Sequence, residues 1–231
     1  MNICVIPARG GSKRIPRKNI KEFCGKPMIA WSIEAAIFSK CFERIIVSTD
    51  DAEIADVAKK FGAEVPFIRP AELADDYVGT TAVIAHAAQW QNEHGAAPDN
   101  VCCVYATAPF VQAKDIIRGL SLLLNSKTDF AFSVTSYGFP IQRAIRITRE
   151  NRVEMLQPEH SNTRSQDLNE TWHDAGQFYW GKTSAWLERK MLFSSSATPV
   201  ILPRHRVQDI DTLEDWARAE LMFSTIAEMP Q

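Results

Sequence analysis

The chain has 231 residues, of which 45% are hydrophobic and 23% charged, a balance typical of a globular protein with a sizeable core. Its net charge of −2 excludes a globally basic nucleic-acid-binding surface. No apolar run approaches the roughly 18 residues of a membrane span, and no secretory signal is visible. The five cysteines show no metal-binding spacing and favour reduced thiols in a cytoplasmic protein.

Short β-branched runs alternate with helical patterns through the first part of the chain. Strands are predicted at Asn2–Pro7, Arg44–Ser48, Val101–Ala106 and Phe130–Thr135, and helices at Pro27–Phe38, Asp51–Phe61, Thr80–Glu93 and Ala113–Leu124. The first three strands are apolar on both faces, which is typical of a parallel sheet covered by helices on two sides. This order predicts an α/β fold with a doubly wound, mostly parallel sheet of the Rossmann-like kind.

The pattern changes in the second half of the chain. Ile141–Thr148 alternates apolar and polar residues, which predicts an antiparallel strand. Glu150–Thr171 is strongly polar, and a loop of this length is usually functional or packed on a partner. The remaining predicted elements are a strand at Ala175–Gly181 and an amphipathic helix at Thr212–Ile226. Since domains average about 150 residues, we expect a single domain over 1–231 with an excursion at about 138–171.

The segment Pro7–Asn19, PARGGSKRIPRKN, directly follows the first predicted strand, and ligands of doubly wound sheets bind at such strand ends. Its two glycines let backbone N–H groups approach an anion, and its five basic residues supply countercharge, so it suits several phosphates in a row. The alternative is a solvated basic loop. The Walker A pattern and the G-x-G-x-x-G fingerprint are both missing, which argues against a Rossmann oxidoreductase.

Two carboxylates, Asp209 and Asp211, flank Ile210 in an extended segment before the last predicted helix. Residues i and i+2 of an extended chain point to the same side, so both carboxylates can meet one ion. Oxygen-only ligation suits Mg²⁺, which takes one or two carboxylates together with substrate phosphates. The alternative is that Asp211 caps the helix near Thr212, with Glu214 completing a capping box. The two roles are compatible.

Other polar residues near strand ends have competing interpretations. Asp50 and Asp51 favour helix capping. Arg69 could reach a base edge or be an ordinary surface residue, and Thr80 could donate a hydroxyl to a base or merely start a helix. His173 is a weaker site candidate, because the aromatic stretch around it is more typical of a core.

Six separated motifs keep their order from Ile3 to about Ala219. They are A-R-x-x-S-K-x-[IL]-P-x-K-N after the first strand, Arg44–Asp50 (RIIVSTD), Arg69–Ala74 (RPAELA), Thr107–Pro109 (TAP), Ala175–Tyr179 (AGQFY) and Asp209–Thr212 (DIDT). Together they resemble the CMP-sialic acid synthetases, which are cytidylyltransferases that activate nine-carbon 2-keto sugar acids. A match at six points is specific, whereas a single match of this kind would not be.

Two of these regions depart from the N-acetylneuraminic acid enzymes of that family. Tyr105–Pro109 (YATAP) stands in place of their Q-P-T-S-P, and Trp172–Trp180 in place of their R-P-N-G-A-I-Y. Both variants resemble the pseudaminic acid branch of the family, and both lie where the sugar is expected. Pseudaminic acid is therefore the expected substrate, with N-acetylneuraminic and legionaminic acids as the alternatives.

The resemblance implies transfer of CMP from CTP to the anomeric hydroxyl of the sugar acid, with release of pyrophosphate. The residues it implies are Arg9, Ser12, Lys18, Asn19, Arg69 and Thr80 for CTP, Tyr105, Thr107, Gln177 and Phe178 for the sugar, Arg143 or Arg164 for its carboxylate, and Asp209 and Asp211 for Mg²⁺. Arg9, Lys18 and Asp211 are the expected catalytic residues.

The resemblance also implies partners. The excursion at about 138–171 matches the family's dimerisation excursion, which predicts a homodimer with composite sites. Neither nucleic acid nor a membrane is an expected partner. A hypothesis of another class is a nucleotide-binding module without catalysis. The paired Asp209 and Asp211 argue against it, since a pure binder needs no metal at the α-phosphate.

Overall fold

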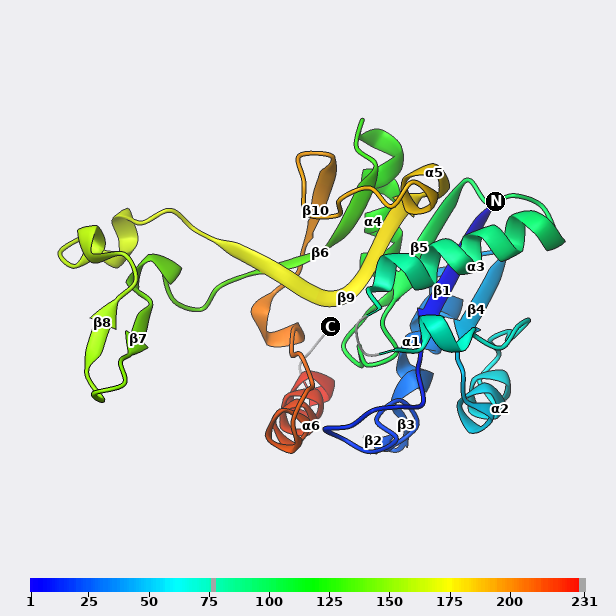
Figure 1. Cartoon of the computed structure of the whole chain (residues 1–231), viewed down its shortest axis with the longest axis horizontal. Helices are drawn as coiled ribbons and strands as arrows, with labels where there is room; N and C mark the ends of the chain where they lie inside the picture. The colour runs from blue at the N-terminus through cyan, green and yellow to red at the C-terminus, as the bar shows by residue number, and fades with distance from the viewer. Residues whose placement is uncertain (76–77, 229–231) are drawn as a thin grey trace.

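The structure, a computed structural model, describes residues 1–75 and 78–228. Its centre is a six-stranded sheet in the order β10-β6-β9-β5-β1-β4 (Figure 1). The strands are β1 (Asn2–Pro7), β4 (Arg44–Ser48), β5 (Asn100–Val104), β6 (Phe130–Ser136), β9 (Trp172–Lys182) and β10 (Ala197–Ile201). Strand β9 runs antiparallel to β5 and β6, and the other neighbours are parallel. The predicted doubly wound, mostly parallel sheet is confirmed.

Helices cover both faces of this sheet. They are α1 (Met28–Ser39), α2 (Ala52–Lys60), α3 (Thr80–His94), α4 (Ala113–Asn125), α5 (Thr183–Leu187) and α6 (Leu213–Glu228). Side chains of α1, α2 and α4 share one core with Cys4 and Ile6, whereas α3 and α5 share another with Ile3 and Val5. Alternate residues of β1 thus point into two different cores, which explains why this strand is apolar throughout. No helix among the described residues is long and apolar enough to cross a membrane.

A third, smaller core joins the two ends of the chain. It packs α6 through Trp216 against the short hairpin of β2 (Glu22–Phe23) and β3 (Lys26–Pro27). Ile15 of the basic segment and Ile210 of the Asp-Ile-Asp segment are both fully buried in it. Because these two residues share one core, the basic segment and the paired carboxylates are held next to each other.

The excursion leaves the sheet between β6 and β9 and ends in a hairpin far from the other elements (Figure 1, left). The hairpin consists of β7 (Ile145–Ile147) and β8 (Val153–Met155) in antiparallel register. The predicted strand at Ile141–Thr148 is therefore too long, because Ile141–Arg143 forms a 3₁₀ turn. The polar segment that follows contains β8 and two further 3₁₀ turns, at Pro158–His160 and Ser165–Asp167.

Strand β10 and helix α5 do not appear among the sequence-based predictions. Pro199 lies in the middle of β10, and a proline argues against a strand unless the strand is at an edge. β10 is such an edge strand, paired with β6. Helix α5 has five residues, which is too short to show a helical period.

Candidate active site

A cavity of about 340 Å³ lies where β1 and β5 end, at the carboxyl edge of the parallel strands. We call it the first cavity. Its lining includes all six residues predicted to bind CTP, namely Arg9, Ser12, Lys18, Asn19, Arg69 and Thr80, together with Tyr105, Thr107 and Asp211. Three further basic or acidic residues, Lys13, Arg14 and Asp75, also line it. Residues from separated parts of the sequence thus form one basic cavity.

The basic segment is anchored on the start of α2. The Gly10 N–H donates to Asp50 Oδ1 at 2.9 Å, and the Arg17 guanidinium donates to both Asp51 oxygens. A Cβ at Gly10 would lie 2.7 Å from Asp51 Oδ2, so a larger residue here would displace the Asp51 side chain. Asp51 accepts from the Ile54 N–H, which confirms that it caps α2. The segment is therefore held to the fold and is not a free solvated loop.

Arg69 and Asn19 are buried under the first cavity. Arg69 donates through Nε to Ser48 Oγ at 3.1 Å and through Nη2 to the Ser48 carbonyl oxygen. Burial lowers the pKa of Arg69 to about 10, which leaves it charged at neutral pH. Asn19 Nδ2 donates to the Arg9 carbonyl oxygen at 2.9 Å. Arg69 is thus a buried cation at the cavity and not an ordinary surface residue.

Asp211 faces the basic residues of the first cavity. Its Oδ1 lies 2.8 Å from Arg14 Nη2 and 3.5 Å from Lys18 Nζ, and Lys18 Nζ also donates to the Ile210 carbonyl oxygen at 2.6 Å. Helix α6 is capped instead by a reciprocal pair. Asp215 Oδ2 accepts from the Thr212 N–H at 2.8 Å, and the Asp215 N–H donates to Thr212 Oγ1 at 3.2 Å. The alternative in which Asp211 caps the helix with Glu214 is therefore wrong. The Asp211 carboxylate lines the first cavity instead.

Asp209 lies two residues before Asp211 and outside the described lining of the first cavity. The pKa of Asp209 is raised, first by partial burial of its carboxylate and then by the negative charge of Asp211. The residue as a whole is nevertheless exposed to solvent. Two mutually repelling carboxylates beside a basic cavity form an oxygen donor set that a divalent cation would stabilise. This donor set fits Mg²⁺.

A second cavity, of about 640 Å³, adjoins the first and shares Thr80 and Tyr105 with it. Thr80 Oγ1 and Tyr105 Oη are hydrogen-bonded at 2.9 Å, and burial raises the pKa of Tyr105 to about 12. Asp174 and Tyr179 also line this cavity, and the Tyr179 hydroxyl donates to Asp174 Oδ2 at 2.5 Å. The outer wall is made by five consecutive residues, Arg189–Phe193.

Two predicted sugar residues are not at either cavity. Phe178 has no exposed surface, and its ring lies against α4, where a Cβ at Gly119 would be 2.8 Å from it. Contact between Phe178 and a sugar is therefore incompatible with this fold. Gln177 is also buried, and its Nε2 donates to the Arg206 carbonyl oxygen at 2.6 Å. Because Arg206 is fixed by a buried ion pair with Asp115, Gln177 supports the segment that leads to Asp209.

The two arginines predicted for the sugar carboxylate lie in the excursion. Arg143 Nη1 donates to Ser165 Oγ at 3.2 Å, and Arg164 forms an ion pair with Asp167 at 2.7 Å. Neither belongs to the described lining of the first or second cavity.

Most of the second cavity is lined by residues that the sequence does not single out as ligands: Asp174, Tyr179, Trp186 and Arg189–Phe193. Asp174 and Tyr179 fall within Trp172–Trp180, the stretch expected near the sugar, whereas Trp186 and Arg189–Phe193 lie outside every motif. Together these residues come from β9, from α5 and from the loop after α5, and no local pattern connects them. One signal was available, the apolar run Met191–Phe193 inside an otherwise polar segment. Apolar side chains in a loop indicate either a core contact or a binding surface.

A mostly parallel sheet whose carboxyl edge carries a basic, polyphosphate-sized cavity with a carboxylate facing it is the architecture of a nucleotidyltransferase. Comparison with known proteins agrees. The sequence profile described as "Cytidylyltransferase" matches residues 3–216, and the chain belongs to this family.

Individual relatives cover almost the whole chain. It is 44% identical over 222 residues, 96% of either chain, to a pseudaminic acid cytidylyltransferase of Campylobacter jejuni subsp. jejuni serotype O:23/36 (strain 81-176). It is 32% identical to the CMP-N,N'-diacetyllegionaminic acid synthase of Legionella pneumophila, covering 96% of this chain and 95% of the relative. A structure of CMP:2-keto-3-deoxy-manno-octonic acid synthetase complexed with CTP has the same fold, with a TM-score of 0.71, 16% identity, and 97% and 99% of the two chains covered.

Proposed function

We propose that the protein transfers CMP from CTP to the anomeric hydroxyl of pseudaminic acid and releases pyrophosphate. The observation that carries this proposal is that two cavities of different chemistry meet at Thr80 and Tyr105. One is basic and suits a triphosphate, and the other is lined by aromatic and apolar side chains and suits an acylated sugar. The identity of 44–45% to two pseudaminic acid cytidylyltransferases supports this choice of sugar.

In this proposal the first cavity binds CTP. Phosphoryl-type transfer depends on positioning and charge neutralisation more than on a protein nucleophile. Arg9, Ser12 and Lys18 hold the triphosphate and stabilise the charge that develops on pyrophosphate. Arg69, Asn19 and Thr80 contact cytosine, which needs both donors and acceptors. The ion pairs of Asp211 with Arg14 and Lys18 would open as phosphates take over these cations.

We propose that Asp209 and Asp211 hold Mg²⁺ beside the α-phosphate. The bound ion would lower the pKa of the attacking sugar hydroxyl, which is otherwise far too weak an acid at neutral pH. Two buried side chains fix the position of the Asp-Ile-Asp segment. Ile210 anchors it in the core, and Gln177 holds the preceding residues by a hydrogen bond to the Arg206 carbonyl oxygen.

The second cavity is the proposed sugar site. Tyr105, Tyr179 and Phe193 offer apolar surface to the N-acyl groups, and Asp174 offers an acceptor to an amide N–H. Arg189 lies in the same lining and supplies a positive charge for the sugar carboxylate.

The roles of Arg143 and Arg164 require a second subunit, and we propose a homodimer. In the dimer the excursion of one subunit would cross to the other, which brings these arginines towards the partner's sugar site. Exposed apolar side chains on the excursion support this proposal. Ile147, Val153 and Phe139 are 71%, 69% and 86% exposed, and a paired excursion would bury them.

We further propose that the enzyme works in the cytoplasm, where CTP is available. All five cysteines are free thiols, as expected in a reducing compartment. Burial raises the pKa of the Cys102 and Cys103 thiols, so they remain protonated and inert.

The test is pyrophosphate release by the purified protein with CTP, Mg²⁺ and one of three sugar acids. We expect rapid release with pseudaminic acid, slower release with legionaminic and N-acetylneuraminic acids, and none above background without sugar or with EDTA. Replacing CTP by UTP or ATP should abolish release, because the base contacts are specific. Absence of release with all three acids would contradict the proposal and favour a nucleotide-binding module.

A further inference from the structure

The outer wall of the second cavity is a loop, residues 188–196, that connects α5 to β10. Its middle residues, Met191–Phe193, line the cavity. Leu192 packs against the core, and the Phe193 ring contacts the edge of Phe132 at a centroid distance of 5.4 Å. Met191 and Phe193 are otherwise well exposed, so few contacts at the middle of the loop fix its position over the sheet.

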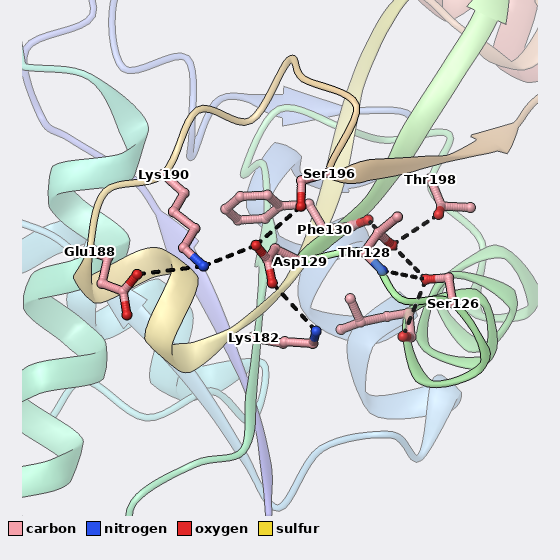
Figure 2. A network of polar contacts seen from close by, with 10 residues as sticks. Ser126, Thr128, Asp129, Phe130, Lys182, Glu188, Lys190, Ser196 and Thr198 are labelled. Carbon is pink, nitrogen blue, oxygen red and sulfur yellow. Dashed lines mark hydrogen bonds and ion pairs between the residues drawn. The ribbon is translucent and has the colours of Figure 1, made fainter.

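Both ends of this loop meet at one side chain, Asp129, which directly precedes β6 (Figure 2). Asp129 Oδ2 accepts from Lys190 Nζ at 3.0 Å at the first end of the loop and from Ser196 Oγ at 3.1 Å at the last. Asp129 Oδ1 accepts from Lys182 Nζ at 3.4 Å. One carboxylate thus joins the two ends of the loop, as in compact surface loops whose ends are close together. We call this junction of Asp129, Lys190 and Ser196 the neck of the loop.

Asp129 is itself fixed to the sheet. Its backbone oxygen accepts from the Lys182 N–H at 3.0 Å, and its N–H donates to the Ser196 carbonyl oxygen at 2.8 Å. The carboxylate is one-fifth exposed and makes charge-assisted contacts to two lysines. A rigid anion at the neck therefore fixes where the loop leaves the sheet and where it returns.

We propose that Asp129 is a positioning residue for the sugar acid. By holding Lys190 and Ser196 together, it keeps Met191–Phe193 over the second cavity and so sets how tightly that cavity closes on its ligand. This inference rests on the proposed function, in which the second cavity receives the sugar. The side-chain partners of Asp129 among the described residues are Lys182, Lys190 and Ser196, and none of them lines the first cavity, so CTP binding is expected to be independent of Asp129.

The test is Asp129→Asn, which keeps the size of the side chain and removes its charge. We expect the KM for pseudaminic acid to rise roughly threefold or more while the KM for CTP changes less than about twofold, since partly exposed ion pairs are weak individually. Hydrogen exchange of residues 188–196 should become faster. The matched control is Glu188→Gln, because Glu188 also contacts Lys190, at 3.5 Å, but does not reach the other end of the loop.

A further variant keeps the proposal falsifiable if Asp129→Asn folds poorly. Ser196→Ala removes the contact at the far end of the neck and should raise the same KM in the same direction. Where Asp129→Asn folds, its combination with Ser196→Ala should be no worse than the more severe single variant, because both act through one contact. A lower melting temperature with an unchanged KM for the sugar would overturn the proposal. Loss of the proposed function would appear differently, as a wild-type protein that does not use the sugar at all.

Discussion

Three ionised residues of the first cavity pair with one another. Asp211 is in contact with Arg14 and Lys18, which are cations that a triphosphate would also attract. Binding of an anionic nucleotide together with a cation would exchange one set of ion pairs for another. Asp211, Arg14 and Lys18 then keep partners of opposite charge in both states, which limits the cost of desolvating them.

The first prediction separates two carboxylates at one helix end. Asp211→Asn should lower kcat about 100-fold or more, because it removes a ligand of the proposed Mg²⁺ site. Its melting temperature should stay near the wild-type value, since Thr212 and Asp215 cap α6. Asp215→Ala should behave in the opposite way, with kcat kept and the melting temperature lowered by roughly 2–4 °C, the effect of losing about 1 kcal/mol of capping. Equal loss of activity in both variants at saturating Mg²⁺ would contradict the assignment.

The second prediction concerns Lys18, which lines the first cavity and is largely buried. Lys18→Ala should weaken CTP use by about 1.5–3 kcal/mol, the value of one charge-assisted phosphate contact, and leave the KM for the sugar largely unchanged. Steady-state kinetics with each substrate varied in turn measure both effects. Lys21→Ala is the control, because Lys21 lies over the Trp216 ring and is not in the described lining of the cavity. A change in the KM for the sugar alone would contradict this assignment and would indicate that Lys18 contacts the sugar.

Among the elements, those of the parallel core were predictable and those that build the second cavity were not. β1 and β4 match their predicted bounds, because buried parallel strands are continuous apolar runs. The Asp-Ile-Asp segment was also predictable, although its helix cap was misassigned, since Asp215 and Glu214 are equally plausible partners by spacing alone. The burial of Phe178 follows from the alternation of side chains along β9, where Phe178 and Trp180 face the core of α1, α2 and α4 and Tyr179 faces that of α3 and α5. The sequence does not show which of these faces lies towards which helices, because this depends on the whole sheet.

The anchoring of the basic segment on α2 leads to a pH prediction. The hydrogen bonds from the Arg17 guanidinium, ahead of all other causes, lower the pKa of Asp51 to about 2 from an ordinary value of 3.8. A carboxylate with a depressed pKa stabilises the fold above pH 3.8, and the effect is lost as the pH falls towards 2. Asp51→Asn should therefore lower the melting temperature at neutral pH, and its difference from wild type should shrink between pH 4 and pH 2.

Thermal unfolding at a series of pH values measures this difference directly. Asp56→Asn on the same helix is the control, because Asp56 is exposed and has no bond to the basic segment among the described residues. A constant difference between Asp51→Asn and wild type across the acid range would rule out the ion pair as its cause.

At the scale of the whole molecule, the excursion is the feature that a single subunit does not explain. Ile147 and Val153 face each other across the hairpin and are both largely exposed. Ile147→Glu should shift the protein from dimer to monomer in light scattering and lower its activity, because composite sites would be lost. Arg146→Gln is the control, since Arg146 alternates to the other face and pairs with Glu154. A wild-type protein that is already monomeric would contradict the proposed homodimer.

The choice of sugar also depends on the whole molecule, because the second cavity takes residues from α3, β9 and α5 and from the loops after β5 and α5. Its aromatic walls and its Asp174 acceptor suit a sugar with two N-acyl groups. A hydroxylated competitor would leave its own polar groups and those of the cavity unpaired, and each unpaired buried group costs about 1–3 kcal/mol. We therefore expect kcat/KM for pseudaminic acid to exceed that for N-acetylneuraminic acid at least about tenfold, since tenfold corresponds to only about 1.4 kcal/mol. Competing the two acids for limiting CTP measures this ratio in one reaction. Equal or reversed product yields would refute the pseudaminic acid assignment while leaving membership of the cytidylyltransferase family intact.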